Sequence, residues 1–151
     1  DYSFIAARTV GPEGRVYAVD LRSDTMERIG RIAESSGLDQ LHPMVADLTE
    51  PLPFDNGTAD LCFLCTVLHG ISSREARSRL FREMVRILKP GGRAVCVDCK
   101  KEPSNFGPPI EMRLSTEEID GYARAAGFEK GGETDLGHNI LMQFRKPVSF
   151  R

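Results

Sequence analysis

Apolar positions along this chain follow two different spacings, which alternate from one end to the other. Short apolar runs typical of buried strands lie at 16–20, 44–47, 61–67 and 93–98. Between them, apolar residues recur every three or four positions, which is the spacing of a helix with one buried face. Strands alternating with helices indicate a parallel sheet with crossover helices. The pattern predicts the α/β class, with 61–67 as the central strand, buried on both faces.

Helix ends are marked by capping and breaking residues. Residues 72–75 and 115–118 each match the capping box, in which a serine is followed three residues later by glutamate. Asp24 is placed to cap an earlier helix that ends at Gly37. Residues 89–92 end the middle helix, because proline cannot continue it. The residues expected on the buried side of the earlier helix are Met26, Ile29, Ile32 and Ala33.

The end of the chain predicts a different strand arrangement. Residues 128–134 and 139–144 have strand character, and too few residues separate them for a crossover helix. The two strands must therefore pair antiparallel. The predicted fold is a mostly parallel sheet closed by a C-terminal antiparallel hairpin.

The chain begins where a nucleotide-binding fold would already be under way. In such folds an acid at the tip of the second strand binds ribose, and a glycine-rich loop lies about 20 residues upstream. Counting back from Asp20 runs off the chain, and residues 1–7 are typical of the helix that such a loop opens. We therefore expect an N-terminally incomplete fold, with its first strand and loop in missing upstream sequence.

The alternative is that the protein lacks these residues altogether. Removing a strand of about 5 to 6 residues from between two neighbours would cost some ten hydrogen bonds. At roughly 1 kcal/mol each, that loss approaches the stability of a whole domain. We predict that the chain alone aggregates, swaps strands or folds poorly, because two apolar strands keep open edges.

Composition excludes several classes of partner. The 151 residues predict one domain over 1–151, and 20 Lys plus Arg against 22 Asp plus Glu leave a net charge of -2. This balance predicts neither nucleic-acid nor membrane binding and favours a small-molecule partner. No apolar run reaches the length of about 18 residues that spans a membrane, and no secretory leader is present, so the prediction is a cytoplasmic protein.

Five short motifs follow one another in order: 16–20 (VYAVD), 46–48 (ADL) with 51–54 (PLPF), 60–61 (DL), 88–92 (LKPGG) and 125–128 (AAGF). Together they resemble the class I S-adenosylmethionine-dependent methyltransferases, especially the small-molecule group related to the ubiquinone and menaquinone C-methyltransferases. The resemblance covers nearly the whole chain. It implies a Rossmann-like fold and methyl transfer from S-adenosylmethionine to a small-molecule acceptor. The departure is the missing Gly-x-Gly-x-Gly loop, which in the family holds the methionine half of the cofactor, so the chain alone is expected to be inactive.

The resemblance also implies cofactor-binding residues. Asp20 is expected to accept hydrogen bonds from the ribose hydroxyls, and Asp47 from the adenine amino group. The alternatives are a helix-capping acid at Asp20 and a solvated loop acid at Asp47. The remaining cofactor-binding candidates are Leu21, as an apolar wall for the adenine, Ala46, Leu48, and Cys65 at the carboxyl end of the central strand.

No catalytic residue is identified by the sequence, although His69 is a candidate. Methyl transfer is an in-line displacement that depends mainly on alignment and desolvation, so a base is optional. If the acceptor is an oxygen or nitrogen, His69 could remove its proton near neutral pH. Alternatively, His69 caps a helix or fixes its loop. Lys100, Lys101 and Arg113 could meet an acidic acceptor or simply be solvated.

The four cysteines form two Cys-x-x-Cys pairs, at 62–65 and 96–99. Both pairs lie on predicted strands, where positions i and i+3 face opposite sides, so we predict buried thiols and no metal. A cross-strand pair of Cys65 and Cys99 is the other possibility, and it could be redox-sensitive.

Two rival functions keep the same fold. One is a non-catalytic or regulatory protein that retains the methyltransferase fold, and the other is a nicotinamide-binding Rossmann protein. Asp20 suits both cofactors, whereas Asp47 and the closing hairpin favour the methyl donor. The sequence identifies neither the acceptor atom nor the oligomeric state.

Overall fold

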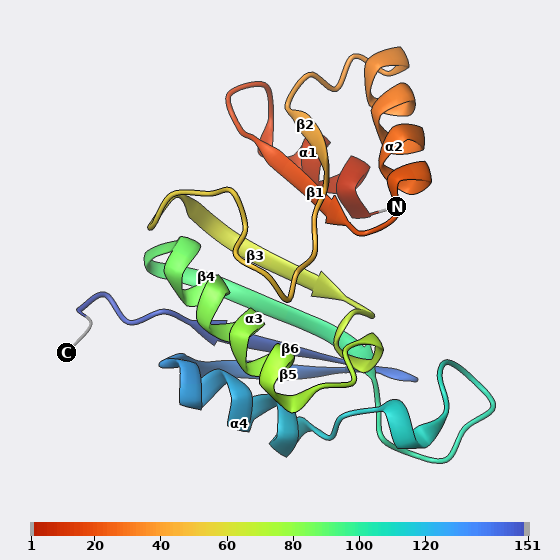
Figure 1. Cartoon of the computed structure of the whole chain (residues 1–151), viewed down its shortest axis with the longest axis vertical. Coiled ribbons are helices and arrows are strands. Elements are labelled where there is room, and N and C mark those ends of the chain that lie inside the picture. Colours follow the sequence, from red (N-terminus) through yellow and green to blue (C-terminus); the bar gives the residue numbers. More distant parts are fainter. Residues whose placement is uncertain (1, 150–151) are drawn as a thin grey trace. The chain divides into compact units, whose positions relative to one another are not determined.

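The computed structural model describes residues 2–149. Its contacts divide the chain into two compact units, residues 1–52 and residues 53–151, and each is described by itself (Figure 1). Both units combine helices with parallel strands, as the predicted α/β class requires. That 1–151 forms a single domain stays a prediction. No helix in the described part of the chain is long and apolar enough to cross a membrane.

The first unit is a two-stranded parallel sheet with two helices. Its elements are α1 (Tyr2–Val10), β1 (Val16–Asp20), α2 (Ser23–Ser35) and β2 (Leu41–Val45). The predicted N-terminal helix is thus confirmed for residues 2–7, and residue 1 lies outside the described residues. The core consists of Ala7, Ala18, Met26, Ile29, Ala33, Leu38 and Leu41, with Phe4 and Val16 packed against it.

Two predicted boundaries in this unit are wrong. Asp24 does not cap α2, whose N-cap residue is Arg22; Asp24 lies in the first turn and forms an ion pair with Arg22 at 2.9 Å. The strand predicted at 44–47 is β2, which begins earlier, at the buried Leu41. It ends at Val45, because the side chain of Asp47 then accepts a hydrogen bond from a backbone N–H two residues ahead and turns the chain.

One residue expected on the buried side of α2 is not buried: Ile32 is 40% exposed.

The second unit is a four-stranded sheet in the order β3-β4-β6-β5. The strands are β3 (Ala59–Cys65), β4 (Leu88–Cys99), β5 (Glu129–Leu136) and β6 (Asn139–Arg145), and the helices are η1 (Leu68–Gly70), α3 (Arg74–Ile87), η2 (Ile110–Met112) and α4 (Thr116–Ala126). β3 and β4 are parallel, whereas β6 runs antiparallel to both β4 and β5. The predicted C-terminal antiparallel hairpin is therefore confirmed.

Helices α3 and α4 cover one face of this sheet (Figure 1). Phe81 of α3 meets Phe144 of β6 edge-to-face, with ring centroids 6.4 Å apart, and stacks on Tyr122 of α4. Ala94 pairs with Phe144, and Cys96 with Met142, so alternate residues of β4 and β6 point to the same covered face. All four of these strand residues are buried, and this face is the core of the unit.

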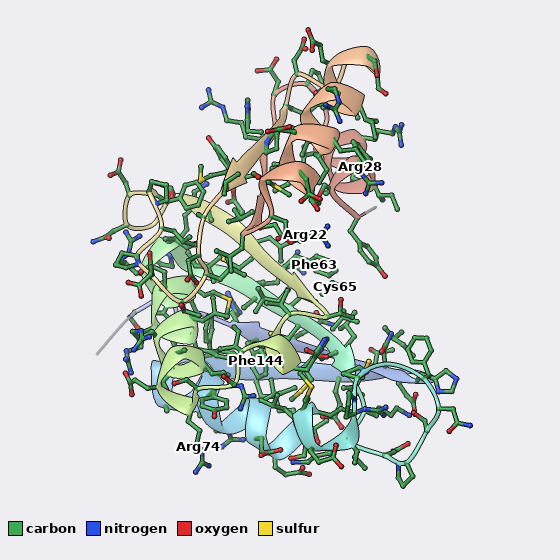
Figure 2. All side chains as sticks on the ribbon, turned by 45° about the vertical axis from the view of Figure 1, so that its right-hand side comes forward. Arg22, Arg28, Phe63, Cys65, Arg74 and Phe144 are labelled. Atoms are coloured by element: carbon green, nitrogen blue, oxygen red, sulfur yellow. The ribbon has the colours of Figure 1, made fainter. Side chains whose placement is uncertain are left out.

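The prediction that residues 61–67 form a central strand buried on both faces is wrong. Among the described residues, β3 pairs only with β4 and therefore lies at the edge of its sheet. Leu64 is buried, but Leu61 and Phe63, on the opposite face, are 49% and 42% exposed; Figure 2 shows Phe63 and Cys65 along this strand. An apolar run shows that both faces are apolar, but not that both are covered.

In the second unit, helix α4 begins at the predicted capping residue, whereas the capping residue of α3 lies one position later than predicted. The capping box at Ser115 and Glu118 is complete, and α4 ends at Ala126 with Gly127 as its C-cap residue, at a φ of 104°. At α3 the cap is Ser73, which accepts from the backbone N–H of Ala76, so the predicted box over 72–75 does not form. The helix ends at Ile87, and the segment 88–92 becomes the start of β4.

Candidate functional site

The carboxyl ends of β1 and β2 lie side by side at one edge of the first unit. Asp20 pairs with Val45, and the backbone N–H of Ala46 donates to the carbonyl oxygen of Asp20 over 3.1 Å. Five of the six residues predicted to hold a cofactor, namely Asp20, Leu21, Ala46, Asp47 and Leu48, are therefore gathered at one strand edge. The carboxyl edge of a parallel sheet is where open α/β folds bind ligands.

Asp20 offers an acceptor oxygen at this edge. Its half-buried carboxylate accepts the backbone N–H of Arg22 through Oδ1 at 2.9 Å, while Oδ2 has no recorded partner among residues 2–149. Asp20 does not cap α2, so the helix-capping alternative is wrong. Leu21 beside it is 65% exposed. A carboxylate oxygen next to an exposed aliphatic side chain can bind a hydroxyl and an apolar ring together.

Asp47 is held in a turn of its own. Its Oδ1 accepts from both the backbone N–H and the hydroxyl of Thr49, at 2.8 and 2.7 Å. This fixes the direction of the carboxylate just after β2 ends. The side chain is half-buried and hydrogen-bonded within this loop turn, and its role toward a ligand stays a prediction. Two oriented carboxylates and Leu21 together fit the hydroxyls, amino group and ring of a nucleoside.

The second unit has its own polar cluster, where β3 and β4 end. Cys65, the sixth predicted cofactor residue, is the last residue of β3. Thr66 follows with a φ of 55°, the only positive φ of a non-glycine residue in the described chain. Its N–H donates to the carbonyl of Val97 and its hydroxyl to that of Cys65. A positive φ costs energy in a residue with a side chain and persists only where surrounding contacts hold it. Residues of this kind are concentrated at functional sites.

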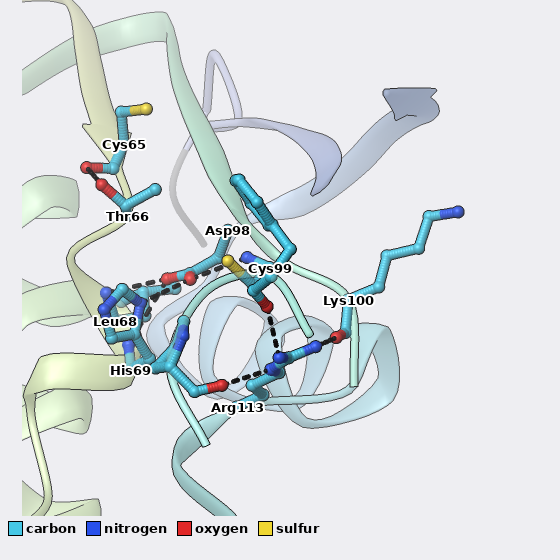
Figure 3. Close-up of polar contacts among 10 residues, drawn as sticks. Cys65, Thr66, Leu68, His69, Asp98, Cys99, Lys100 and Arg113 are labelled. Carbon is cyan, nitrogen blue, oxygen red and sulfur yellow. Dashed lines mark hydrogen bonds and ion pairs between the residues drawn. The ribbon is translucent and has the colours of Figure 1, made fainter. Parts of the chain in front are cut away.

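Asp98 organises this cluster (Figure 3). It is 3% exposed and accepts from the backbone N–H groups of Leu68 (3.0 Å), His69 (3.4 Å) and Cys99 (2.9 Å). Its Oδ1 also lies 2.7 Å from Nδ1 of His69. A carboxylate at the end of β4 thereby fixes both the backbone of η1 and the imidazole ring that η1 carries. His69 is thus fixed with its loop, and its catalytic role stays a prediction.

The basic side chains near this cluster form hydrogen bonds and ion pairs with other residues of the chain. Arg113 is 5% exposed and donates to the backbone carbonyls of Lys100, Glu102, Phe106 and Pro108, and to the hydroxyl of Ser104. Lys100 pairs with Asp135, and Lys101 with Glu118. The prediction that Arg113 meets an acidic acceptor is wrong, because the guanidinium fixes the loop over residues 100–108 instead.

The cysteines are free thiols on two neighbouring strands. Leu64 pairs with Cys96 and Cys65 with Val97, so the two members of each Cys-x-x-Cys pair face opposite sides of the sheet. Burial raises the pKa of Cys62 and of Cys96 to about 12, and burial with the nearby Asp98 raises that of Cys99. Within residues 2–149, no three metal-ligating side chains come together.

Sequence reasoning missed Asp98 as a site residue. The signal was present, because residues 93–98 are an apolar run that ends in one carboxylate, as do residues 16–20 before Asp20. What the sequence could not show is that Asp98 meets His69, which lies 29 residues away in the chain.

Comparison with known proteins places the chain among methyltransferases. A family model described as a methyltransferase domain matches residues 1–92. The ubiquinone/menaquinone biosynthesis C-methyltransferase of Idiomarina loihiensis is 33% identical over 100 residues, which are 65% of this chain and 38% of that protein. The demethylmenaquinone methyltransferase of Bacillus cytotoxicus is 31% identical over 108 residues, covering 71% of this chain and 43% of that protein. The chain thus spans about two fifths of these relatives' length.

Solved structures show the same fold. A SAM-dependent methyltransferase from Aquifex aeolicus matches 95% of this chain and 75% of its own, with a TM-score of 0.85 and 23% identity. The geranyl diphosphate C-methyltransferase of Streptomyces coelicolor, solved with S-adenosyl-L-homocysteine, matches 95% of this chain and 66% of its own, with a TM-score of 0.77 and 18% identity. At this level of identity the likeness shows a Rossmann-like fold.

Proposed function

We propose a function from one premise: the chain belongs to the methyltransferase domain family. The full-length protein that contains it transfers a methyl group from S-adenosylmethionine to a small-molecule acceptor. The observation that carries this proposal is the edge of the first unit, where Asp20 and Asp47 follow neighbouring parallel strands with their carboxylates oriented by local hydrogen bonds.

The residues at this edge suit the nucleoside of the methyl donor. Asp20 would accept hydrogen bonds from the ribose hydroxyls through the oxygen that Arg22 leaves unused, and Asp47 would accept from the adenine amino group. Leu21 would contact one side of the adenine, with Ala46 and Leu48 beside it. That Cys65, the last residue of β3, also binds the cofactor stays a prediction from the sequence. The donor supplies an electrophilic methyl group on a sulfonium, whose departure leaves a neutral thioether.

The acceptor is proposed to be a small organic molecule. Two of the proteins named above are called C-methyltransferases, of ubiquinone/menaquinone biosynthesis and of geranyl diphosphate. A net charge of -2 gives no general attraction for nucleic acid. The cytoplasmic location and the absence of membrane binding inferred from the sequence stay predictions.

Donor turnover tests the proposal. The full-length protein is incubated with S-adenosylmethionine and a panel of phenols, quinols, amines and thiols, and S-adenosylhomocysteine is measured by mass spectrometry. We expect product that depends on both protein and acceptor. Donor binding without turnover over the whole panel would instead support the non-catalytic alternative. Binding of a nicotinamide dinucleotide in place of S-adenosylmethionine would support a dehydrogenase-like protein.

A further inference from the structure

We propose that Asp98 fixes His69 as the general base of the reaction, and that the acceptor is therefore one that loses a proton as it is methylated. Such acceptors carry a hydroxyl, an N–H or an acidic C–H group, in contrast to thioethers and tertiary amines. The inference rests on the proposed function and adds to it a base, a positioning residue and a class of acceptor.

The hydrogen-bond pattern around Asp98 determines which nitrogen of His69 carries the hydrogen. Three backbone N–H groups donate to the two carboxylate oxygens, so Asp98 acts as an acceptor throughout. Nδ1 of His69 lies 2.7 Å from Oδ1 and must therefore be the donor in this contact. A neutral imidazole with its hydrogen on Nδ1 has a bare lone pair on Nε2. The ring is thus held in the tautomer that can take up a proton at Nε2.

The imidazole ring is also partly exposed to solvent, unlike the carboxylate that holds it. The side chain of His69 is 19% exposed, whereas that of Asp98 is 3% exposed. Nε2 has no recorded partner among the described residues. Asp98 also fixes the backbone that carries the ring, through the N–H groups of Leu68 and His69. A base whose orientation is fixed by a buried carboxylate is the arrangement that nucleophile activation requires.

The position in the sheet supports the same role. His69 follows β3, and Asp98 is next to the last residue of β4, so both lie at the carboxyl ends of neighbouring parallel strands. Ligands of open α/β sheets bind at these ends. The strained Thr66 lies between the end of β3 and η1, where a purely structural turn would be expected to use glycine.

The proposed step is a proton transfer. The bond between the acceptor atom and its hydrogen breaks, a bond from that hydrogen to Nε2 forms, and the electron pair stays on the acceptor atom as the nucleophile for the methyl group. His69 becomes an imidazolium beside the carboxylate of Asp98 and then passes the proton to water. Asp98 takes up no proton in this step.

Tautomer measurement tests the positioning role without any ligand. Two-dimensional NMR of the ¹⁵N-labelled protein at neutral pH distinguishes protonated from bare ring nitrogens, with His42 and His138 as internal references. We expect the hydrogen of His69 on Nδ1. In Asp98→Asn the amide can donate to Nδ1, so the hydrogen should move to Nε2. Asp135→Asn, which alters an exposed carboxylate paired with Lys100, should leave the His69 tautomer unchanged. A wild-type hydrogen on Nε2, or no response to Asp98→Asn, would overturn the inference.

Turnover tests the base itself, in the full-length protein and with an acceptor identified by the assay above. His69→Asn keeps a donor near the Nδ1 position but has no base, and it should lower kcat by about 10²- to 10⁴-fold with the affinity for S-adenosylhomocysteine unchanged. His138→Gln is the matched control and should keep full activity. Unchanged turnover in His69→Asn, or an acceptor without a transferable proton, contradicts this inference alone. Failure of the wild type to bind S-adenosylhomocysteine would contradict the proposed function, while the tautomer result would still stand.

Discussion

At the scale of single residues, three carboxylates lie at or just after the carboxyl ends of strands, and they differ in burial and in their hydrogen-bond donors. Asp98 is buried and all of its acceptor capacity is directed at protein groups. Asp20 and Asp47 are half-buried, and each accepts a hydrogen bond from a backbone N–H two residues ahead. Burying a carboxylate without hydrogen-bond donors is costly. The buried Asp98 with its full set of protein donors therefore suits a positioning role, whereas the half-buried Asp20 and Asp47 suit a ligand.

Arg113 provides a test at this scale, because one side chain holds a whole loop. Lysine cannot reproduce the planar fork of donors, so Arg113→Lys should release the loop over residues 100–108. We expect the free energy of unfolding to fall by about 2 to 3 kcal/mol, the loss of one or two net hydrogen bonds to a charged group, since water replaces others. Urea denaturation measures the change, and proteolysis should become faster within the loop. Arg124→Lys, at an exposed ion pair, is the control. Equal stability of both variants would refute this role.

The buried thiols give a second test. With the pKa of Cys62 and Cys96 raised to about 12, almost no thiolate exists at neutral pH, and the thiolate is the reactive form. Both should resist iodoacetamide in the native protein and react fully in urea. Mass spectrometry of peptides from the two samples measures this. Elemental analysis should find no zinc, and one bound zinc per chain with loss of folding on chelation would contradict the thiol assignment.

At the scale of elements, the helix and strand types and the C-terminal hairpin followed from the sequence, whereas the covering of strand faces and the contacts between distant side chains did not. The apolar stripe of α3 and the capping box of α4 depend on neighbours in sequence, and both were predicted. The covering of β3 depends on what packs against each face, which no local pattern records, and there the prediction failed at Leu61 and Phe63. The contact of His69 in η1 with Asp98 in β4 joins residues far apart in the sequence and was missed for the same reason.

The capping box of α4 makes stability depend on pH. Glu118 accepts the backbone N–H of Ser115 and pairs with Lys101, and these contacts hold its pKa below the ordinary value of 4.5. Its stabilising effect is complete above that ordinary value and is lost as the pH falls through the lowered native value. The melting temperature of Glu118→Gln should therefore lie below that of the wild type at neutral pH and converge with it on acidification.

Two variants complete this comparison. Ser115→Ala should cost about 1 kcal/mol at neutral pH, which is the usual contribution of an N-cap serine. Glu111→Gln, at an exposed position in η2, serves as the control and should melt with the wild type over the same range. If the difference in melting temperature between Glu118→Gln and the wild type grew as the pH fell, the sign of the pKa shift would be wrong.

At the scale of the whole molecule, the open strand edges are the main physical liability. Among the described residues, β1 and β2 pair only with each other and β3 pairs only with β4, so each of these three strands leaves backbone donors and acceptors unmatched along one side. The exposed Leu61 and Phe63 on β3 add apolar surface beside such an edge. Unpaired apolar edges are templates for pairing with another chain.

The 151-residue chain should therefore self-associate when it is produced alone. Light scattering coupled to size exclusion should show a mass that rises with concentration, and Phe63→Lys should reduce it, since a lysine opposes pairing at an edge. Asp24→Lys, on the surface of α2, changes the net charge of the chain by more than Phe63→Lys does, and it should leave the measured mass unchanged. A concentration-independent monomer that unfolds cooperatively would show that these edges are harmless.

The central claim is that Asp20 binds the ribose of the methyl donor, and calorimetric titration of S-adenosylhomocysteine into the full-length protein tests it most directly. The wild type should bind one equivalent. Asp20→Ala should bind tenfold to several-hundredfold more weakly, because each hydrogen bond to a charged acceptor contributes about 1.5 to 3 kcal/mol. Asp24→Ala, four residues away and at an exposed ion pair with Arg22, should match the wild type. Equal affinity of Asp20→Ala and wild type would remove Asp20 from the site and contradict the account.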